Sequence, residues 1–213
     1  MVLSLKNQEE YNFMISKPKF KICRRLGPGV YDKCQTPKFN SGATMKGRRG
    51  SRPKALSEYG TQLIEKQKIR FSYGITERQL SNYVKKASLV KGAGTVEKFY
   101  EELEFRLDNV IYRMGLAPSR RAARQMVSHG HFIVNDHKVT IPSYQLKLGD
   151  VVKIREGSKS KKLFENLAER LKDYTAPTWL TFNMEKLEGN ILDKPKNNES
   201  FLDLNAVLEF YSR

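Results

Sequence analysis

The stretch RLDNVIYRMGLAPSRRAARQMVSHGHFIVNDHKVTIPSYQLKLGDVVKI, residues 106–154, decides the fold of this chain. Its first part carries four apolar residues at the spacing of one helical face: Leu107, Val110, Ile111 and Met114. Gly115 follows them and predicts the end of that helix, because glycine readily adopts the left-handed conformation that closes a helix.

A second helix is predicted to begin after Ser119, whose hydroxyl suits an N-cap, and to end at Gly130. Its inward side is formed by four small or apolar residues: Ala122, Ala123, Met126 and Val127. Arg120, Arg121 and Arg124 fall on the opposite side, near the helix N-terminus, where backbone N–H groups also attract phosphate. Because these arginines lie off the apolar side, we expect their replacement to leave the fold intact.

The remainder of the stretch predicts strands. Residues 132–134 and 138–140 form a hairpin around Asn135 and Asp136, two residues that tolerate the positive φ of a tight turn. The chain then turns into a last strand over 151–154. The stretch is therefore predicted to be a small α/β unit, with two helices packed on a short, curved antiparallel sheet.

Six basic residues of this unit are candidates to border one groove: Arg106, Arg113, Arg120, Arg121, Arg124 and Lys138. One alternative is that they are ordinary solvent-facing residues, but three arginines within five positions beside a side of small residues are unusual. A DNA-reading helix-turn-helix is another alternative. It is weakened by the strands that follow and by the single amide, Gln125, on the presumed reading helix.

The charge of the whole chain points to a polyanionic partner. Its 213 residues include 39 Lys and Arg against 23 Asp and Glu, with a formal net charge of +16. RNA, DNA and an anionic membrane surface are the candidates. Hydrophobic residues make up 39%, which excludes a wholly disordered chain. The apolar runs are too short to span a bilayer, so we expect no integral membrane protein.

The sequence offers little material for catalysis. Two Cys and three His are too few for a disulfide scaffold or a catalytic zinc site. His129, His131 and His137 have no matched nucleophile or paired acid, and Asp150 is explained by turn chemistry. We therefore expect no catalytic residue, no metal site, no cofactor and no enzymatic activity.

The basic excess concentrates in residues 17–54, which carry twelve Lys and Arg against one Asp. Such a stretch cannot bury enough surface to fold alone, so it is either a solvated tail or an extended arm. Arginine pairs and the interleaved Phe20, Tyr31 and Phe39 favour an arm that becomes ordered on a phosphate backbone.

Residues 56–92 predict two helices. Ser57 caps the first, which Gly74 ends, and Thr76 with Gln79 forms a capping box that begins the second.

Residues 106–154 resemble the RNA-binding module shared by the fourth protein of the small ribosomal subunit, some tRNA synthetases, pseudouridine synthases and heat-shock proteins. Six motifs resemble that ribosomal protein in its own order: RRLG at 24–27, LSEYGTQLIEKQKIRFSYGITERQL at 56–80, RLDNVIYRMG at 106–115, IPSY at 141–144, PTWL at 177–180 and EFYSR at 209–213. On these motifs the chain is identified as a member of the ribosomal family over residues 19–213. The alternative is a stress-associated or RNA-modifying protein that shares only the module.

The resemblance implies an α+β fold in three parts. An extended basic N-terminal arm covers 1–55, a helical domain covers 56–92 and is completed by 198–213, and the inserted module with its following strands covers 93–197. Because residues 176–213 are net acidic, we expect structure or a protein contact at that end and no RNA surface.

The resemblance also implies a function. The family binds small-subunit ribosomal RNA and nucleates assembly of its 5′ domain, lines the pore through which mRNA enters, and touches the fifth small-subunit protein at an interface tied to decoding accuracy. We expect no membrane partner. The RNA contacts expected at matching positions are Arg24, Arg25, Arg48, Arg49, Arg52, Lys54, Lys66, Lys68, Arg70, Tyr73, Arg78, Arg106, Arg113, Arg120, Arg121, Arg124, His129, His131 and Lys138.

The chain departs from the family pattern at its cysteines. Some bacterial members bind zinc through four Cys in the N-terminal arm. Cys23 and Cys34 fall at two of those places and Phe20 and Gly29 at the others, so we expect no zinc.

The motif spellings also bear on location. RFSYG at 70–74 and RRLG at 24–27 resemble plastid members more than most free-living bacteria. The expected location is the ribosome of a plastid (chloroplast), with a mitochondrion or the bacterial cytoplasm as alternatives. We expect residues 1–16 to be a short extension that does not align with the family.

Overall fold

The structure is a computed structural model that describes residues 18–37, 39, 56–90, 94–165, 167–172, 174–196 and 201–212. The chain divides into two compact units: Met1–Leu89 with Asn198–Arg213, and Val90–Asn197. The described part of the first unit is helical and the second combines helices with a five-stranded sheet, so the predicted α+β class is confirmed. Within these described ranges, no helix is long and apolar enough to cross a membrane.

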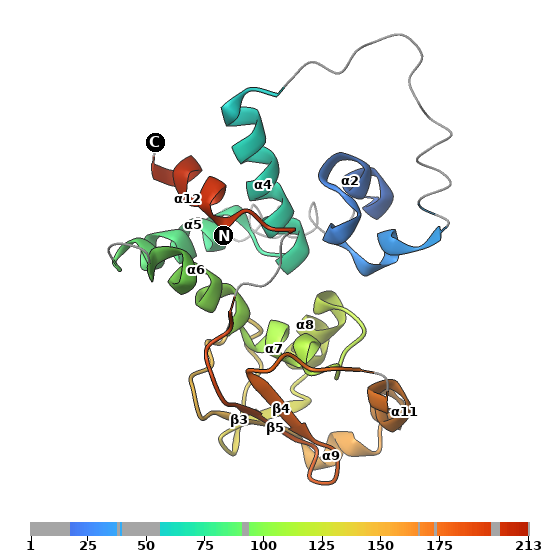
Figure 1. Cartoon of the computed structure of the whole chain (residues 1–213). Helices are drawn as coiled ribbons and strands as arrows, with labels where there is room; N and C mark the ends of the chain where they lie inside the picture. Colours follow the sequence, from blue (N-terminus) through green and yellow to red (C-terminus); the bar gives the residue numbers. More distant parts are fainter. Residues whose placement is uncertain are drawn as a thin grey trace, which may run out of the picture. The chain divides into compact units, whose positions relative to one another are not determined.

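The first unit is built around one long helix, α4, with α2 and α12 beside it (Figure 1). Its helical elements are α2 (Lys19–Leu26), η1 (Pro28–Val30), η2 (Asp32–Gln35), α4 (Glu58–Tyr73), α5 (Glu77–Ser88) and α12 (Leu204–Ser212). Elements from both ends of the sequence therefore pack on the same helix.

The predicted caps set the ends of α4 and α5. Ser57 Oγ accepts a hydrogen bond from the N–H of Gly60 at 3.2 Å, and Gly74 closes α4 in the left-handed conformation with φ 62°. The capping box is confirmed, because Thr76 Oγ1 accepts from the N–H of Gln79 at 3.3 Å and Gln79 Oε1 accepts from the N–H of Thr76 at 3.2 Å.

The last helix, α12, binds α4 and α5 through apolar and polar contacts. Val207 is fully buried. Tyr211 Oη donates to Glu77 Oε1 at 2.6 Å, and Lys66 Nζ donates to the same oxygen at 2.8 Å. Lys66 Nζ also lies 4.2 Å from the ring centroid of Phe210. The carboxylate of Glu77 therefore joins α4, α5 and α12.

The expectation of an extended arm is wrong for residues 18–37 and 39, which fold into α2, η1 and η2 and pack on α4. The cluster that they form has six buried members: Ile22, Cys23, Leu26, Val30, Cys34 and Phe39. Ile64 and Phe71 of α4 pack against it, as does Tyr31. Phe39 and Tyr31 thus belong to a core, not to a phosphate-binding arm. The composition of residues 17–54 does not reveal this core, because α4, outside that basic stretch, supplies some of the apolar side chains that cover it.

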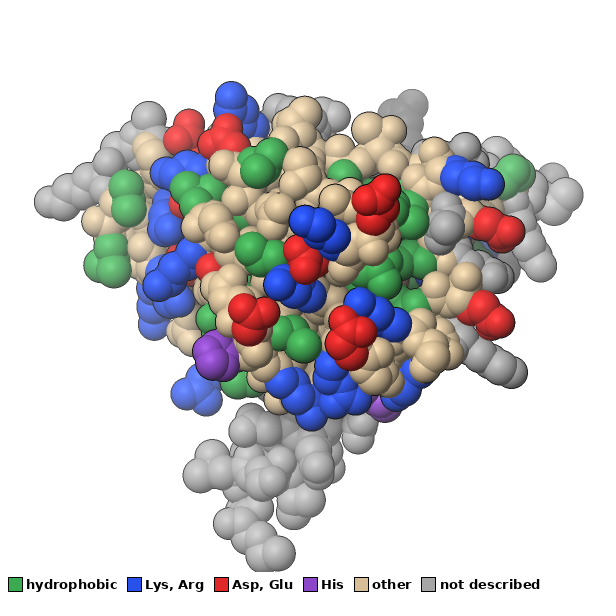
Figure 2. All heavy atoms as spheres, turned by 90° about the horizontal axis from the view of Figure 1, so that it is seen from below, with side chains coloured by type: hydrophobic (Ala, Val, Ile, Leu, Met, Phe, Trp, Pro, Cys, Tyr) green, Lys and Arg blue, Asp and Glu red, His purple; other side chains and the backbone are tan. Residues whose placement is uncertain are grey.

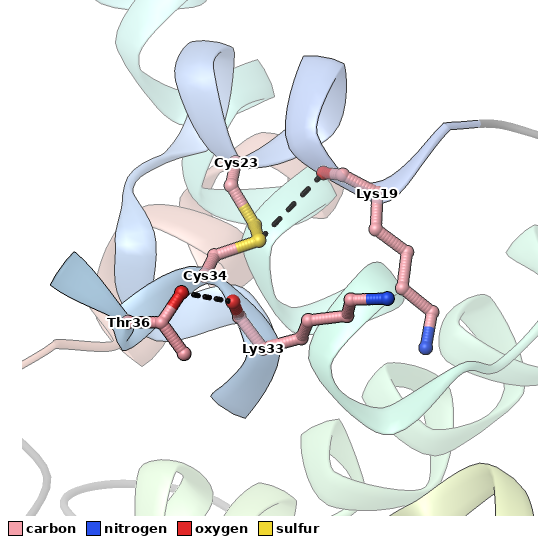
Figure 3. Close-up of a disulfide and its surroundings, with 5 residues drawn as sticks. All are labelled: Lys19, Cys23, Lys33, Cys34 and Thr36. Atoms are coloured by element: carbon pink, nitrogen blue, oxygen red, sulfur yellow. Dashed lines mark hydrogen bonds between the residues drawn. A yellow bond between two sulfur atoms is a disulfide. The ribbon is translucent and has the colours of Figure 1, made fainter. Parts of the chain in front are cut away.

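A disulfide joins Cys23 of α2 to Cys34 of η2 (Figure 3). The two Cα atoms are 6.4 Å apart, and both residues are buried. Nearby, Thr36 Oγ1 donates to the carbonyl oxygen of Lys33 at 3.1 Å, which closes the turn after η2 (Figure 3). The two cysteines thus have a covalent structural role in this unit.

The second unit packs helices on an antiparallel sheet. Its helices are α6 (Gly94–Glu104), α7 (Leu107–Arg113), α8 (Arg120–Ser128), α9 (Glu156–Lys159), α10 (Lys162–Glu165) and α11 (Leu167–Lys172). Its strands are β1 (Phe132–Val134), β2 (His137–Lys138), β3 (Val151–Ile154), β4 (Leu180–Asn183) and β5 (Glu188–Ile191), in the order β2-β1-β3-β5-β4. Figure 1 shows α7 and α8 together on one side of this sheet.

The register of β1 and β3 gives the sheet its apolar face. Phe132 pairs with Ile154 and Val134 with Val152, and all four side chains are buried. They form one core cluster with the apolar sides of α7 and α8. The predicted arrangement of two helices on a short sheet is confirmed.

The hairpin turn is confirmed as well, but its second strand is His137–Lys138 and not the predicted 138–140. Asn135 and Asp136 adopt φ of 47° and 68°, the left-handed conformations that a tight hairpin requires. Asn135 Nδ2 donates to Asp150 Oδ1 at 2.8 Å, and Asp150 Oδ2 accepts from the N–H of Lys147 at 2.8 Å. Asp150 therefore stabilises two turns.

Glu77 predicts a pH dependence for the first unit. Burial opposes its charge, but hydrogen bonds from Lys66 and Tyr211 and the charges of Lys66 and Arg70 outweigh it, so the pKa of Glu77 lies below 4.5. Its contribution to stability is therefore present above pH 4.5 and lost as the pH falls through the lowered pKa. Glu77→Gln should destabilise at pH 7 by roughly 1 kcal/mol or less, because the carboxylate is 42% exposed.

Chemical denaturation of both proteins from pH 7 to pH 3.5 measures this difference, which should shrink below about pH 4.5. Glu97→Gln, in the second unit, is the control for loss of one exposed negative charge and should leave unfolding of the first unit unchanged. A Glu77→Gln difference that stays constant over the whole range would contradict the prediction.

The disulfide predicts a redox dependence of stability. Reduction by a dithiol should lower the free energy of unfolding of the first unit by about 3 kcal/mol, the chain-entropy value for a loop of roughly this length. Hydrogen exchange of α2 and α4 amides with and without reductant measures the effect. The double variant Cys23→Ser, Cys34→Ser should behave as the reduced protein under both conditions. Equal protection of α2 in the native chain under both conditions would refute the role assigned to the bond.

Candidate nucleic-acid interface

The outward side of α8 presents a row of polar side chains to solvent. Arg121, Gln125 and His129 follow one another at four-residue spacing and are exposed. Ala123 and Val127 are fully buried on the inward side, so packing of the apolar side fixes the direction in which the row points.

Lys138 of β2 lies at the end of this row. It is exposed, and its side chain lies against Gly130, at the turn that follows α8. The structure thus brings together Arg121, His129 and Lys138, three of the predicted contacts, on adjacent elements.

Two other arginines of α8 contact α7. Arg124 donates through Nε and Nη2 to Asp108 Oδ2 at 3.0 and 2.8 Å. Arg120 Nε donates to Asn109 Oδ1 at 2.7 Å, and the Arg120 guanidinium lies 4.6 Å from the ring centroid of Tyr112. The expectation that all three α8 arginines can be removed without affecting the fold is therefore wrong for Arg120 and Arg124, because each satisfies a buried polar group of α7.

Arg106 and Arg113 also pair with acidic groups. Arg106 is 2% exposed, and its Nε and Nη2 donate to Asp108 Oδ1 and Oδ2 at 3.0 and 2.8 Å. Arg113 donates through Nε and Nη2 to the fully buried carboxylate of Glu104 at 3.0 and 2.9 Å. The predicted RNA contact at Arg106 is wrong, because the side chain is buried in the second unit, where it neutralises Asp108. Arg113 retains a side chain that is 18% exposed.

His131 differs from its neighbour His129. It is buried, and its Nδ1 lies 2.9 Å from Ser158 Oγ. Burial and the charges of Lys161, His129 and Arg155 hold the pKa of His131 below its usual value, so the ring is neutral at pH 7. The prediction of a phosphate contact is corrected for His131, which packs inside the second unit, whereas His129 is exposed.

The predicted contacts of the first unit divide by exposure. Three are exposed: Arg24, Arg25 and Arg78. Two are partly buried: Lys68 and Arg70. Lys66 is buried against Glu77, and Tyr73 is 1% exposed, so the structure contradicts an RNA contact at these two positions. Arg48, Arg49, Arg52 and Lys54 lie outside the described residues.

One face of the molecule is seen in Figure 2. Lys and Arg side chains lie in groups along its left and lower margins, and Asp and Glu are interspersed with basic residues in the centre. In the part of the chain that the structure describes, no cluster of three or more His, Cys, Asp or Glu is placed to hold a metal ion.

Sequence reasoning missed the acceptors on α6 and α7: Glu104, Asp108 and Asn109. All three are buried. Their signal in the sequence is the position of polar residues directly beside Leu107, Val110 and Ile111, the apolar side of α7, which is buried. Such residues must have internal partners, and arginines are the partners found here.

Two family models match the chain and together span most of it. The S4 domain matches residues 105–152, the segment that forms α7, α8, β1, β2 and the start of β3. The ribosomal protein S4/S9 N-terminal domain matches residues 15–104. The match to the second model distinguishes this chain from proteins that have only the RNA-binding module.

Individual relatives agree over nearly the whole length. The chain is 41% identical over 206 residues to small ribosomal subunit protein uS4 of Halothermothrix orenii, with 92% of this chain and 97% of the relative covered. It is 43% identical over 204 residues to uS4 of Thermotoga petrophila and 44% over 200 residues to uS4c of Oltmannsiellopsis viridis, at the same coverage. With this identity over almost all of both chains, and with the fold and the basic α8 row described above, the chain belongs to the uS4 family of small ribosomal subunit proteins.

Proposed function

We propose that this chain is a structural, non-enzymatic component of the small ribosomal subunit and that it binds ribosomal RNA through the outward side of α8. The observation that carries the proposal is the exposed row of Arg121, Gln125 and His129 on the S4 domain, with Lys138 at its end. The relatives are named as proteins of the small subunit, which identifies the RNA.

The chemistry of the row suits an RNA backbone. A guanidinium binds two phosphate oxygens in a planar fork, and Lys and His add charge or hydrogen bonds at shorter reach. RNA helices expose phosphates and 2′-hydroxyls, which a rigid helix with projecting donors contacts by shape. Arg120 and Arg124 lie four residues apart in the neighbouring line of α8, beside α7, and are only partly buried.

The first unit supplies a second group of contacts in this proposal. Arg24 and Arg25 lie in the last turn of α2 and are exposed, as is Lys33 of η2. These basic side chains therefore project from helices that are packed on α4.

Finer roles follow from the family resemblance. We infer that the protein binds early in assembly of the 5′ domain, contacts the fifth small-subunit protein and contributes to decoding accuracy. Arg48, Arg49, Arg52 and Lys54 are assigned to the pore through which mRNA enters. Replacing these four by Ala should slow translation through structured mRNA more than it slows subunit assembly; the reverse would refute the assignment.

We place the protein in a plastid ribosome on the spelling of RRLG and RFSYG. The relatives at 41–44% identity include both uS4c of Oltmannsiellopsis viridis and uS4 of bacteria, so the spelling of the two motifs alone carries this placement, and a bacterial ribosome is the alternative.

The α8 row predicts the salt dependence of RNA binding. Arg121→Ala removes one neutralised phosphate and should reduce the slope of log K against log salt by about 0.7–0.9. The fold should be unaffected, because Arg121 is exposed. Filter binding to small-subunit ribosomal RNA at several salt concentrations measures the slope.

Lys186→Ala is the matched control. Lys186 is an exposed cation in the turn between β4 and β5, and β4 lies at the opposite edge of the sheet from β2. Its removal should leave the slope unchanged. If Arg121→Ala and Lys186→Ala give the same slope, the outward side of α8 is not the RNA site.

A further inference from the structure

Three side chains of α7, Asp108, Asn109 and Tyr112, contact the arginines of α8; we call them the α7 anchors. We propose that the α7 anchors are positioning residues of the RNA site, which hold the guanidinium groups of Arg120 and Arg124 in one orientation before RNA binds. The inference rests on the function proposed above and assigns roles to residues that do not themselves contact RNA.

The contacts restrain each guanidinium at more than one point. Arg124 is held by two hydrogen bonds, from Nε and Nη2 to Asp108 Oδ2 at 3.0 and 2.8 Å. Arg120 is held by Nε on Asn109 Oδ1 at 2.7 Å and by the ring of Tyr112 at 4.6 Å. A planar group with two such contacts has lost its rotation about the terminal bonds.

Two of the anchors, Asp108 and Asn109, are themselves held by buried contacts. The Asp108 side chain is 2% exposed and also accepts two hydrogen bonds from the buried Arg106. Asn109 is 1% exposed, and its Nδ2 donates to the backbone carbonyl of Glu104 at 2.9 Å. Movement of Asp108 would break its hydrogen bonds with Arg106, and movement of Asn109 would break its bond to the Glu104 carbonyl. Arg124 and Arg120 are therefore bound to fixed acceptors.

Restraint of this kind affects binding in a defined way. Ordering a long side chain at an interface weakens affinity by about two- to tenfold, and an arginine ordered during folding avoids that loss when RNA binds. Arg121 lies between the two anchored arginines in sequence but is exposed on α8. Arg121 therefore serves as the exposed arginine with which the anchored Arg120 and Arg124 are compared.

A plain structural role is the competing explanation, in which the anchors only attach α7 to α8. A double-mutant cycle separates the two. The variants are Asn109→Ala, Arg120→Ala and their combination, with binding to small-subunit ribosomal RNA measured at a temperature where circular dichroism shows each protein folded. Asp108 is left unchanged because it also neutralises the buried Arg106.

If Asn109 positions Arg120, Asn109→Ala should weaken binding about three- to tenfold in the native background and less than about twofold in the Arg120→Ala background. In the Arg121→Ala background it should retain its full effect. Tyr112→Leu should follow the same pattern, and it replaces Asn109→Ala in the cycle if that variant does not fold.

Arginine-to-lysine substitutions test the second anchored residue. Arg124→Lys keeps the charge but loses the planar fork on Asp108, so it should weaken binding more than Arg121→Lys does. Equal losses for the two lysine variants, or equal effects of the anchor variant with and without Arg120, would overturn the proposal. If Arg120→Ala, Arg121→Ala and Arg124→Ala all leave binding unchanged, the α8 site itself is wrong, which is a different failure.

Discussion

The buried carboxylate of Asp108 is the constraint on which the second unit depends. Removing a carboxylate from water is strongly unfavourable unless it is paired and fully hydrogen-bonded. Arg106 approaches it from the N-cap of α7 and Arg124 from α8, so its oxygens accept four N–H groups. The same pairing that satisfies the carboxylate sets α7 against α8 and thereby aims the outward side of α8 at solvent.

The regular elements could be predicted from the sequence because each depends on neighbours a few residues away. Helical spacing from Leu107 to Met114, the Thr76–Gln79 capping box and the Asn135–Asp136 turn are all local signals. The structure has each of these where the sequence predicts it. Local chemistry also explained Asp150, whose carboxylate accepts hydrogen bonds that stabilise two turns.

The fate of individual basic side chains could not be predicted in the same way. Arg106, Arg120 and Arg121 are the same residue type within one segment, yet one is buried, one is anchored and one is exposed. The three arginines differ because only some of them reach hydrogen-bond acceptors on α7. The positions of those acceptors depend on how the helices pack. The folding of residues 18–37 escaped prediction for a related reason, since their core is covered by Ile64 and Phe71 of α4, which lies beyond the basic stretch.

The composition of the first unit has a consequence for biosynthesis. Its long helix α4 is completed by α12, which follows it by more than a hundred residues and binds Lys66 and Glu77. All elements of the second unit lie between them in sequence. During translation the N-terminal segment usually folds first. Here the whole second unit leaves the translating ribosome before α12, the helix that completes the packing of α4, has been synthesised. The later part of the chain therefore gains its RNA-binding shape before the earlier part is finished.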